Sequence, residues 1–186
     1  LNQLDNYYTS MGTNKDEADG DEDISDEEVK DKFDEMQSEA TEELGEKVEE
    51  DLDAEGLLSG EYEGFIDMEI TSQYVTLTLN GSVLFNSGRA EIKKDAAVFV
   101  DKLGDVLKGY NDNLIEIRGY TDSVPVSASN KYADNMELSQ ARAYSVYKFL
   151  VNSKNMSEES LECSGRGEQE PIASNDTAEG RALNRR

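Results

Sequence analysis

The chain has 186 residues, of which 42 are Asp or Glu and 18 are Lys or Arg, so its formal net charge is −24. It contains no histidine and a single cysteine, Cys163. A nucleic-acid binder needs a basic surface, which this composition does not supply. Histidine catalysis, histidine metal sites, an internal disulfide and a cysteine zinc site are excluded as well. We therefore expect neither a cofactor nor a metal.

The acidic residues gather at the start of the chain. Residues 1–56 hold 22 acidic and 4 basic residues, a net charge of −18, whereas residues 57–186 carry −6. An acidic segment with few large apolar residues repels itself and cannot build a core. We predict a flexible acidic segment over 1–24, an acidic amphipathic linker helix within 25–60 and one globular domain over 61–186.

The first residue and the hydropathy of the chain bear on its origin. The sequence begins with Leu1 and has no apolar run of about 18 residues, the length that crosses a membrane. We expect a fragment that starts just after a membrane anchor or signal, rather than a cytosolic protein that has lost its methionine.

Residues 26–54 have the pattern of one long helix. Apolar residues recur every three or four positions and form a narrow stripe on an acidic surface. Gly45 should weaken this helix by about 1 kcal/mol. The stripe has to meet either the following domain or a second copy of the chain, so docking and a homodimer both remain open. It consists of Val29, Phe33, Met36, Ala40, Leu44, Val48 and Leu52.

The remaining residues alternate between strand and helix patterns. Helices between strands imply crossover connections and some parallel pairing. The fold class is therefore α/β (α+β), a two-layer sandwich in which helices pack on one face of a mixed sheet. The expected strands are 62–70, 73–79, 113–119 and 160–167, with a turn at Asn80-Gly81, and the expected helices are 91–109, 136–152 and 177–186.

A long polar loop, residues 121–134, leaves the carboxyl end of the strand at 113–119, where open α/β sheets form ligand crevices. Asp122 directly follows that strand, and Arg142 lies near the start of the next helix. Set apart across a crevice, the two charges suit a zwitterion, because the carboxylate binds an ammonium and the guanidinium binds a carboxylate. Alternatively they pair with each other and hold the loop.

Four motifs in order resemble the OmpA-like peptidoglycan-binding domain. They lie in LFNSGRAEI around Phe85, in GYTD at 119–122, in NMELSQARA at 135–143, and in the two stretches GRGE and NDTAEGRALNRR near the end. The resemblance covers roughly residues 62–186. Within it, the Val124-Pro125 pair, the sequence at 135–139 and the acidic extension resemble the MotB family, the wall-anchoring stator subunits of the flagellar motor.

The resemblance implies which residues bind. Asp122 would hold the ammonium group of the peptidoglycan stem-peptide diamino acid, and Arg142 would hold its carboxylate. Support from the C-terminal helix would come from Asn184 and Arg185. Phe85 fits the core better than the ligand wall. The pocket would be shaped by Thr121, Asn135, Leu138 and Ser139, with Asn135 and Ser139 also capping the helix.

The family usually has histidine before Thr-Asp, whereas this chain has Tyr120. Tyrosine keeps a ring and a hydrogen-bonding tip but carries no charge near neutral pH. Tyr120 could alter which stem peptide is preferred, while Asp122 would still bind an ammonium and Arg142 a carboxylate.

The resemblance implies non-catalytic anchoring of a flagellar stator to the wall, in the periplasm or cell-wall space, with an inner-membrane helix upstream of this sequence. The partners would be peptidoglycan, a second copy of the chain and a channel-forming stator subunit. An outer-membrane lipoprotein or porin-type tether is an alternative function. A wall hydrolase is a distant one, with Glu137, Glu168 or Glu170 paired to Asp122.

Overall fold

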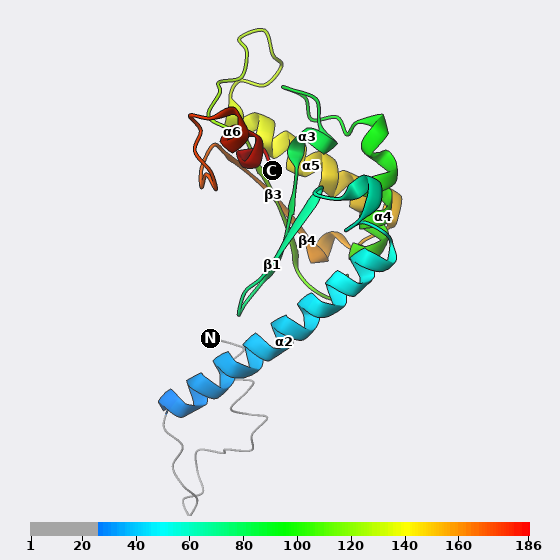
Figure 1. Cartoon of the computed structure of the whole chain (residues 1–186), viewed down its shortest axis with the longest axis vertical. Helices are drawn as coiled ribbons and strands as arrows, with labels where there is room; N and C mark the ends of the chain where they lie inside the picture. Colours follow the sequence, from blue (N-terminus) through cyan, green and yellow to red (C-terminus); the bar gives the residue numbers. More distant parts are fainter. Residues whose placement is uncertain (1–25) are drawn as a thin grey trace, which may run out of the picture. The chain divides into compact units, whose positions relative to one another are not determined.

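The computed structural model describes residues 26–186, and the segment expected to be flexible, 1–24, lies outside them. The described chain divides into two compact units. The first takes residues up to 46 together with 70–75, and the second takes 47–69 and 76–186. The second unit contains most of the strands and helices labelled in Figure 1.

Helix α2 spans Asp26–Ala54, the range expected for the linker helix. Within the first unit, the side chain of Ile70 packs so closely on Gly45 that any side chain at this glycine would collide with it. The glycine that costs helix stability thus provides room for Ile70. The apolar stripe is unevenly covered, because Val48 and Leu52 are buried whereas Met36 is 54% exposed.

Strands β1 (Ile66–Ile70) and β2 (Val75–Leu79) form a hairpin. Their antiparallel direction follows from the Asn80 N–H, which donates to the carbonyl of Phe65 at 3.1 Å. The prediction of a strand from residue 62 was wrong at its start. Gly60–Tyr62 forms the 3-10 helix η1, and Gly60 and Gly64 turn the chain with φ values of 64° and 76°.

The chain after β2 differs from the expected turn. Asn80 caps a short helix, α3 (Gly81–Leu84), and its side chain accepts a hydrogen bond from the Ser82 N–H at 3.0 Å. Helix α4 (Ala97–Lys108) begins later than the predicted residue 91 and follows the 3-10 helix η2 (Lys94–Ala96). The reason is that Ile92 is extended and pairs with Phe85, so it cannot join the helix.

The last four regular elements were expected from the sequence, with ends shifted by up to two residues. They are β3 (Ile115–Tyr120), α5 (Asn135–Lys154), β4 (Leu161–Gly167) and α6 (Ala178–Asn184), with the 3-10 helix η3 (Glu158–Ser160) before β4. Strands β3 and β4 pair in parallel, with Ile115 opposite Leu161, so α5 is the expected crossover helix.

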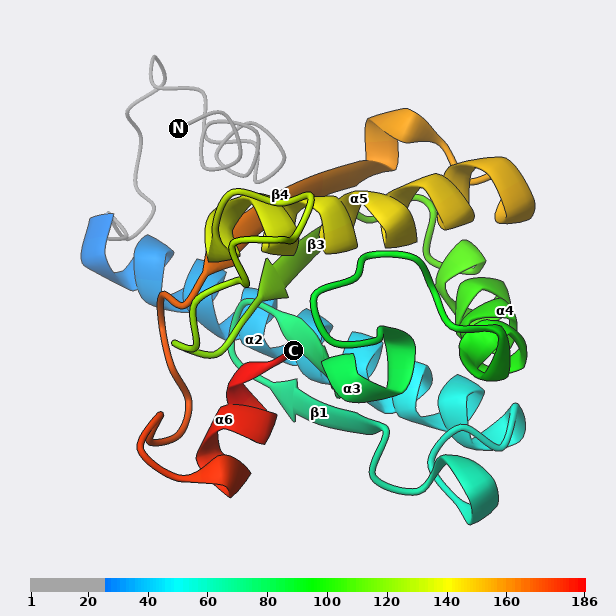
Figure 2. The same ribbon diagram turned by 90° about the horizontal axis from the view of Figure 1, so that it is seen from above.

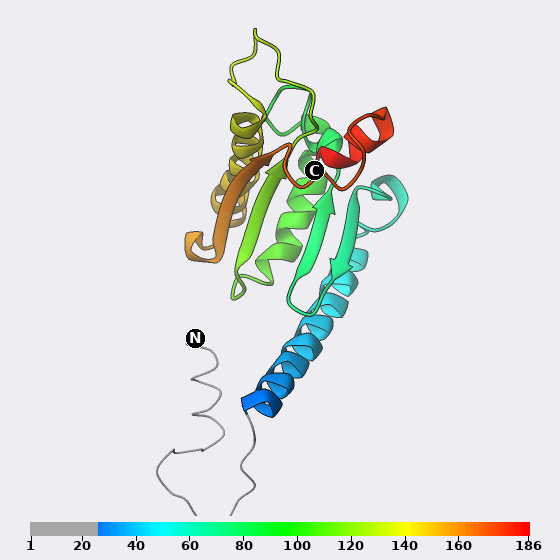
Figure 3. The same cartoon turned by 90° about the vertical axis from the view of Figure 1, so that its left-hand side faces the viewer.

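The four strands form two two-stranded sheets, β1–β2 and β3–β4, instead of one continuous mixed sheet. Figure 3 shows them standing in one layer, with α4 and α5 on one side. The rings of Tyr62 and Phe65 pack on Phe99 of α4 at centroid distances of 5.4 and 5.5 Å. Helix α5 packs on β3, β4 and α4, which completes a two-layer sandwich of strands and helices.

Two contacts fix the ends of α5. At its C-terminal end the buried Lys154 ammonium contacts the carboxylates of Asp101 and Asp105 on α4 at 2.7 and 2.8 Å. Near its start, the Gln140 amide oxygen accepts the Gly165 N–H at 2.6 Å and the Ser139 hydroxyl accepts the Gly167 N–H at 2.9 Å. Figure 2, seen from above, shows α5 running alongside β3 and β4.

Candidate functional site

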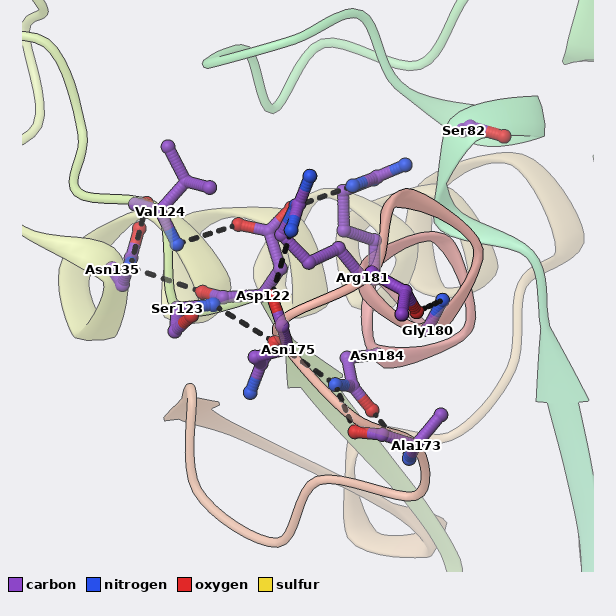
Figure 4. Close-up of polar contacts among 12 residues, drawn as sticks. Ser82, Asp122, Ser123, Val124, Asn135, Ala173, Asn175, Gly180, Arg181 and Asn184 are labelled. Atoms are coloured by element: carbon purple, nitrogen blue, oxygen red, sulfur yellow. Dashed lines mark hydrogen bonds and ion pairs between the residues drawn. The ribbon is translucent and has the colours of Figure 1, made fainter.

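Asp122 lies just beyond the carboxyl end of β3 and is 9% exposed. One oxygen of its carboxylate accepts a hydrogen bond from the Arg185 guanidinium at 2.6 Å, and the other accepts the Val124 N–H at 3.0 Å. Its main-chain carbonyl accepts the Asn135 side-chain amide at 3.1 Å (Figure 4). The Asp122 carboxylate is thus held in a fixed orientation by groups from the loop, α5 and the C-terminal end of the chain.

Arg142 is 7% exposed on the buried side of α5. Its Nε donates to the carbonyl of Arg89 at 2.8 Å, and one terminal nitrogen donates to the carbonyl of Asn86 at 3.2 Å. The guanidinium also lies over the Phe85 ring, 5.2 Å from its centroid. The partners of this cation are therefore neutral: two carbonyls and an aromatic face.

Asp122 and Arg142 form no ion pair with each other among residues 26–186. The alternative in which these two charges simply pair is therefore wrong for this structure. Burial lowers the pKa of Arg142, the positive charge of Arg185 lowers it further, and the Asp122 carboxylate opposes both effects. Two guanidinium groups thus share the surroundings of a single carboxylate, and that carboxylate is bound to Arg185.

The pocket-shaping residues expected from the sequence lie around the same strand end. Thr121 is buried, and its N–H donates to the Gly167 carbonyl at 2.7 Å. Its hydroxyl oxygen has no hydrogen-bond partner among residues 26–186. Leu138 and Ser139 are also buried on α5. Glycine is required at 119, because a side chain there would collide with the Ser139 carbonyl.

The expected helix cap was wrong. Asp134, one residue before α5, is the cap, and its side chain accepts the Glu137 N–H at 2.8 Å. The Glu137 carboxylate in turn accepts the Ala133 N–H at 2.6 Å. Asn135 instead donates to the carbonyls of Asp122 and Val124, and thereby ties the loop to the start of α5.

The C-terminal helix supports the site through Asn184, which is fully buried. Its side chain accepts the N–H groups of Ile172 and Ala173 at 2.9 and 3.0 Å and donates to the Asn175 side chain at 2.9 Å. Asn175 accepts the Ser123 N–H at 3.2 Å, next to Asp122 (Figure 4). Asn184 therefore positions the loop beside the carboxylate, and its own polar atoms are occupied by protein groups.

Tyr120 is buried, and its hydroxyl donates to the Glu170 carboxylate at 3.0 Å. The Arg186 guanidinium stacks on the Tyr120 ring at 3.7 Å from its centroid, and the Arg186 carbonyl accepts the Tyr120 N–H at 2.8 Å. The tyrosine at this position thus holds the end of the chain against β3.

Sequence reasoning missed the pairing of Arg185 with Asp122. The two residues are 63 positions apart, and no local pattern connects them. The cap at Asp134 could have been found, because Asp followed three residues later by Glu is a capping-box pattern. The contact from Asn175 to Ser123 has no sequence signal that we recognise.

A cavity of about 390 Å³ lies beside the site, between the polar loop, the start of α5 and the end of β4. It shares Asn135 with the site, but Asp122 and Arg142 do not line it. Its lining residues are Pro125, Val126, Ala133, Asp134, Asn135, Met136, Arg166, Gly167, Glu168 and Gln169.

Within residues 26–186 no group of three or more Cys, Asp or Glu side chains could hold a metal ion. Over the same range no helix is both long and apolar enough to cross a membrane.

The sequence matches the OmpA family over residues 84–185, more than half of the chain, and the protein belongs to this family. The family resemblance seen in the motifs is thereby confirmed. The matched range begins at the last residue of α3 and includes β3, β4, α4, α5 and α6, and with them Asp122 and Arg142.

Individual relatives include motility proteins and a wall anchor. Motility protein B of Bacillus subtilis (strain 168) is 32% identical over 121 residues, which are 65% of this chain and 46% of that protein. This chain thus spans less than half the length of that relative. A MotB-like protein from Desulfovibrio vulgaris superimposes with a TM-score of 0.74 at 27% identity, over 82% of this chain and 91% of the other.

The cell-wall anchor of the T6SS from Pseudomonas aeruginosa superimposes with a TM-score of 0.62 at 27% identity, over 76% of this chain and 91% of the other. A MotB-like protein and a cell-wall anchor therefore share this fold.

Proposed function

We propose that this chain binds peptidoglycan without cleaving it, and that Asp122 and Arg142 hold the diamino acid of the stem peptide. The observation that carries the proposal is the buried Arg142 guanidinium, whose hydrogen bonds reach only neutral carbonyls although it lies near a buried carboxylate. A buried cation without an anionic partner is costly unless a ligand supplies one. A ligand carboxylate beside a ligand ammonium would complement both residues.

Purified peptidoglycan sacculi provide the direct test. We expect Asp122→Asn and Arg142→Gln each to weaken pull-down by about ten- to a hundred-fold, because each removes a charge-assisted contact of about 1.5–3 kcal/mol. Lys148→Gln is the matched control, since it removes one exposed cation from the same helix. Wild-type retention by both site variants would contradict the proposal.

The hydrolase alternative makes a different prediction from the same sacculi. Two of its three candidate partner carboxylates are engaged in the fold, since Glu137 closes the cap of α5 and Glu170 accepts the Tyr120 hydroxyl. We therefore expect no soluble wall fragments after prolonged incubation. Release of fragments by wild type but not by Asp122→Asn would favour hydrolysis.

At the level of the whole protein we propose anchoring of a flagellar stator to the wall, from the periplasm or cell-wall space. Similarity to motility protein B supports this function. The competing function is that of an outer-membrane lipoprotein or porin-type protein that tethers the membrane to peptidoglycan. It would use the same ligand. The upstream gene sequence separates the two, because a stator subunit requires a transmembrane helix and a lipoprotein requires a lipid-modified cysteine.

We further propose that two copies of the chain form a homodimer. This dimer would assemble with a channel-forming partner subunit. The half-exposed apolar stripe of α2 supports this, since Met36 lies on it and is largely exposed. Light scattering on the chain with and without residues 1–60 tests the dimer. An unchanged monomer mass in both would exclude α2 as the dimerisation element.

A further inference from the structure

The Arg142 guanidinium is held by a single tight turn, residues 86–89. The Arg89 N–H donates to the Asn86 carbonyl at 3.0 Å, and this hydrogen bond closes the turn. The carbonyls of the first and last residues of the turn, Asn86 and Arg89, also accept the hydrogen bonds of Arg142, at 3.2 and 2.8 Å. The direction in which the guanidinium points therefore depends on where this turn lies.

The turn belongs to a loop, residues 86–91, that is fixed at its base and held by a second contact at its tip. At the base, Phe85 pairs with Ile92 in antiparallel direction. At the tip, the Gly88 carbonyl accepts a hydrogen bond from the Asn130 side-chain amide at 3.0 Å. The φ of Gly88 is 64°, which favours glycine, and a side chain there would also collide with the Asn130 amide. The tip therefore requires a glycine for its backbone and for its contact with Asn130.

Asn130 belongs to the polar loop, and hydrogen bonds within that loop orient it. Its N–H donates to the Ser127 carbonyl at 2.8 Å, and its side-chain oxygen accepts the Tyr132 N–H at 3.3 Å. The side-chain nitrogen is thereby left to donate to the turn. The polar loop begins beside Asp122 and ends at the start of α5. Asn130 therefore joins the loop that follows Asp122 to the turn that holds Arg142.

The same two segments share an ion pair, which provides a comparison within the structure. The Lys131 ammonium contacts the Glu91 carboxylate at 2.8 Å, but the two side chains are 54% and 62% exposed. Water and salt screen an ion pair that is so exposed, and such pairs contribute little. The hydrogen bond from Asn130 to Gly88 is partly buried. We therefore expect Asn130, rather than Lys131, to hold the turn in place.

We propose that Asn130 is a positioning residue of the binding site. Through the Gly88 carbonyl it fixes the turn at 86–89, and through the turn it fixes the direction of the Arg142 guanidinium relative to Asp122. This inference rests on the proposed function and deepens it by naming a residue that acts on the site without contacting the ligand. A guanidinium binds a carboxylate best in one planar geometry, so a turn that moves weakens binding although both charges remain.

The first measurement needs no ligand. In the whole chain labelled with ¹⁵N, the Arg142 Nε–H signal is assigned by its absence from Arg142→Gln, and its exchange with water is measured by NMR. We expect Asn130→Ala to speed this exchange by about fivefold, the value of one hydrogen bond, because the Arg89 carbonyl that accepts the Nε–H is no longer fixed. Lys131→Gln is the matched control and should change the rate by less than about twofold. An unchanged rate in Asn130→Ala would overturn the inference.

The second measurement is a binding titration of the same variants with purified sacculi. Asn130→Ala should bind about fivefold more weakly than wild type, whereas Lys131→Gln should bind like wild type. In the Arg142→Gln background, Asn130→Ala should weaken binding by less than about twofold further, because Asn130 acts through Arg142. A fivefold loss in both backgrounds would overturn the inference. Wild type that does not bind sacculi would overturn the proposed function, and the exchange rates would still decide whether Asn130 positions Arg142.

Discussion

The two ends of helix α5 each bury a cation, and they treat it in opposite ways. Lys154 in the last turn contacts two carboxylates, Asp101 and Asp105. Arg142 near the start donates its hydrogen bonds to carbonyls and lies over the Phe85 ring. The two residues are equally buried, at 7% exposed each. A cation whose charge is compensated inside the fold contributes to stability, whereas one that lacks an anion is available to a ligand. The exposed fraction does not distinguish Lys154 from Arg142, whereas the charge of the groups that each contacts does.

The largest expected effect is on stability, and it comes from removing the side chain of Asn184, which holds the loop beside Asp122. Asn184→Ala leaves the polar groups of Ile172, Ala173 and Asn175 without their partner in a fully buried place. We expect the free energy of unfolding to fall by about 3 kcal/mol, as measured by urea denaturation. Asn152→Ala, an exposed asparagine of α5, is the control and should change it by less than about 0.5 kcal/mol. A similar loss in both variants would contradict the role of Asn184.

The next effect concerns Arg142 and separates binding from stability. Arg142→Met keeps the length of the side chain and removes a buried charge. We expect binding to sacculi to fall by about ten- to a hundred-fold while the free energy of unfolding stays equal or rises, because the cost of burying the cation disappears. Parallel pull-down and urea denaturation measure the two quantities. A loss of stability as large as the loss of binding energy would show that the guanidinium is structural.

Lys154→Met should show the reverse pattern. The substitution leaves Asp101 and Asp105 as like charges one helical turn apart. Since both carboxylates are 57% exposed, we expect a loss of only about 1 kcal/mol of unfolding free energy, and binding unchanged. Denaturation and pull-down of the same preparation test this. Weakened binding would mean that the two ends of α5 are coupled.

The smallest effect is a pH dependence at the Lys154 end. Burial disfavours the ammonium, but the hydrogen bonds that it donates to Asp101 and Asp105 outweigh this effect, so the pKa of Lys154 is raised above its ordinary 10.5. A raised pKa means that the stabilisation is complete below the pKa of the unfolded chain and is lost as pH rises through the folded one. The stability difference between wild type and Lys154→Met should therefore stay constant up to about pH 10 and shrink above it. A difference that is independent of pH through this range would contradict the ion pairs.

The sequence predicted the helices and strands of the fold better than the segments that connect them. The range of α2 followed from the spacing of its apolar residues, and the β3–α5–β4 crossover followed from alternating patterns. The late start of α4 did not, because it depends on the pairing of Ile92 with Phe85. Pairings of this kind are tertiary contacts and leave no local periodicity in the sequence.

The candidate site shows the same division. Asp122 and Arg142 stood out because Asp122 follows a strand and Arg142 lies near the start of the next helix. Their actual partners, Arg185 and the carbonyls of Asn86 and Arg89, come from distant segments. A sequence can indicate which charges lie at a strand end, whereas the balance between them depends on how the C-terminal segment folds back.

The hydrogen bonds that α5 makes to β4 have a consequence for how copies of the protein meet. A strand paired on one side presents free N–H groups, which recruit strands from other molecules and seed aggregation. Here the N–H groups of Gly165 and Gly167 are taken by the Gln140 and Ser139 side chains. In the half of β4 next to the site, these two N–H groups are therefore not available to a strand of another copy.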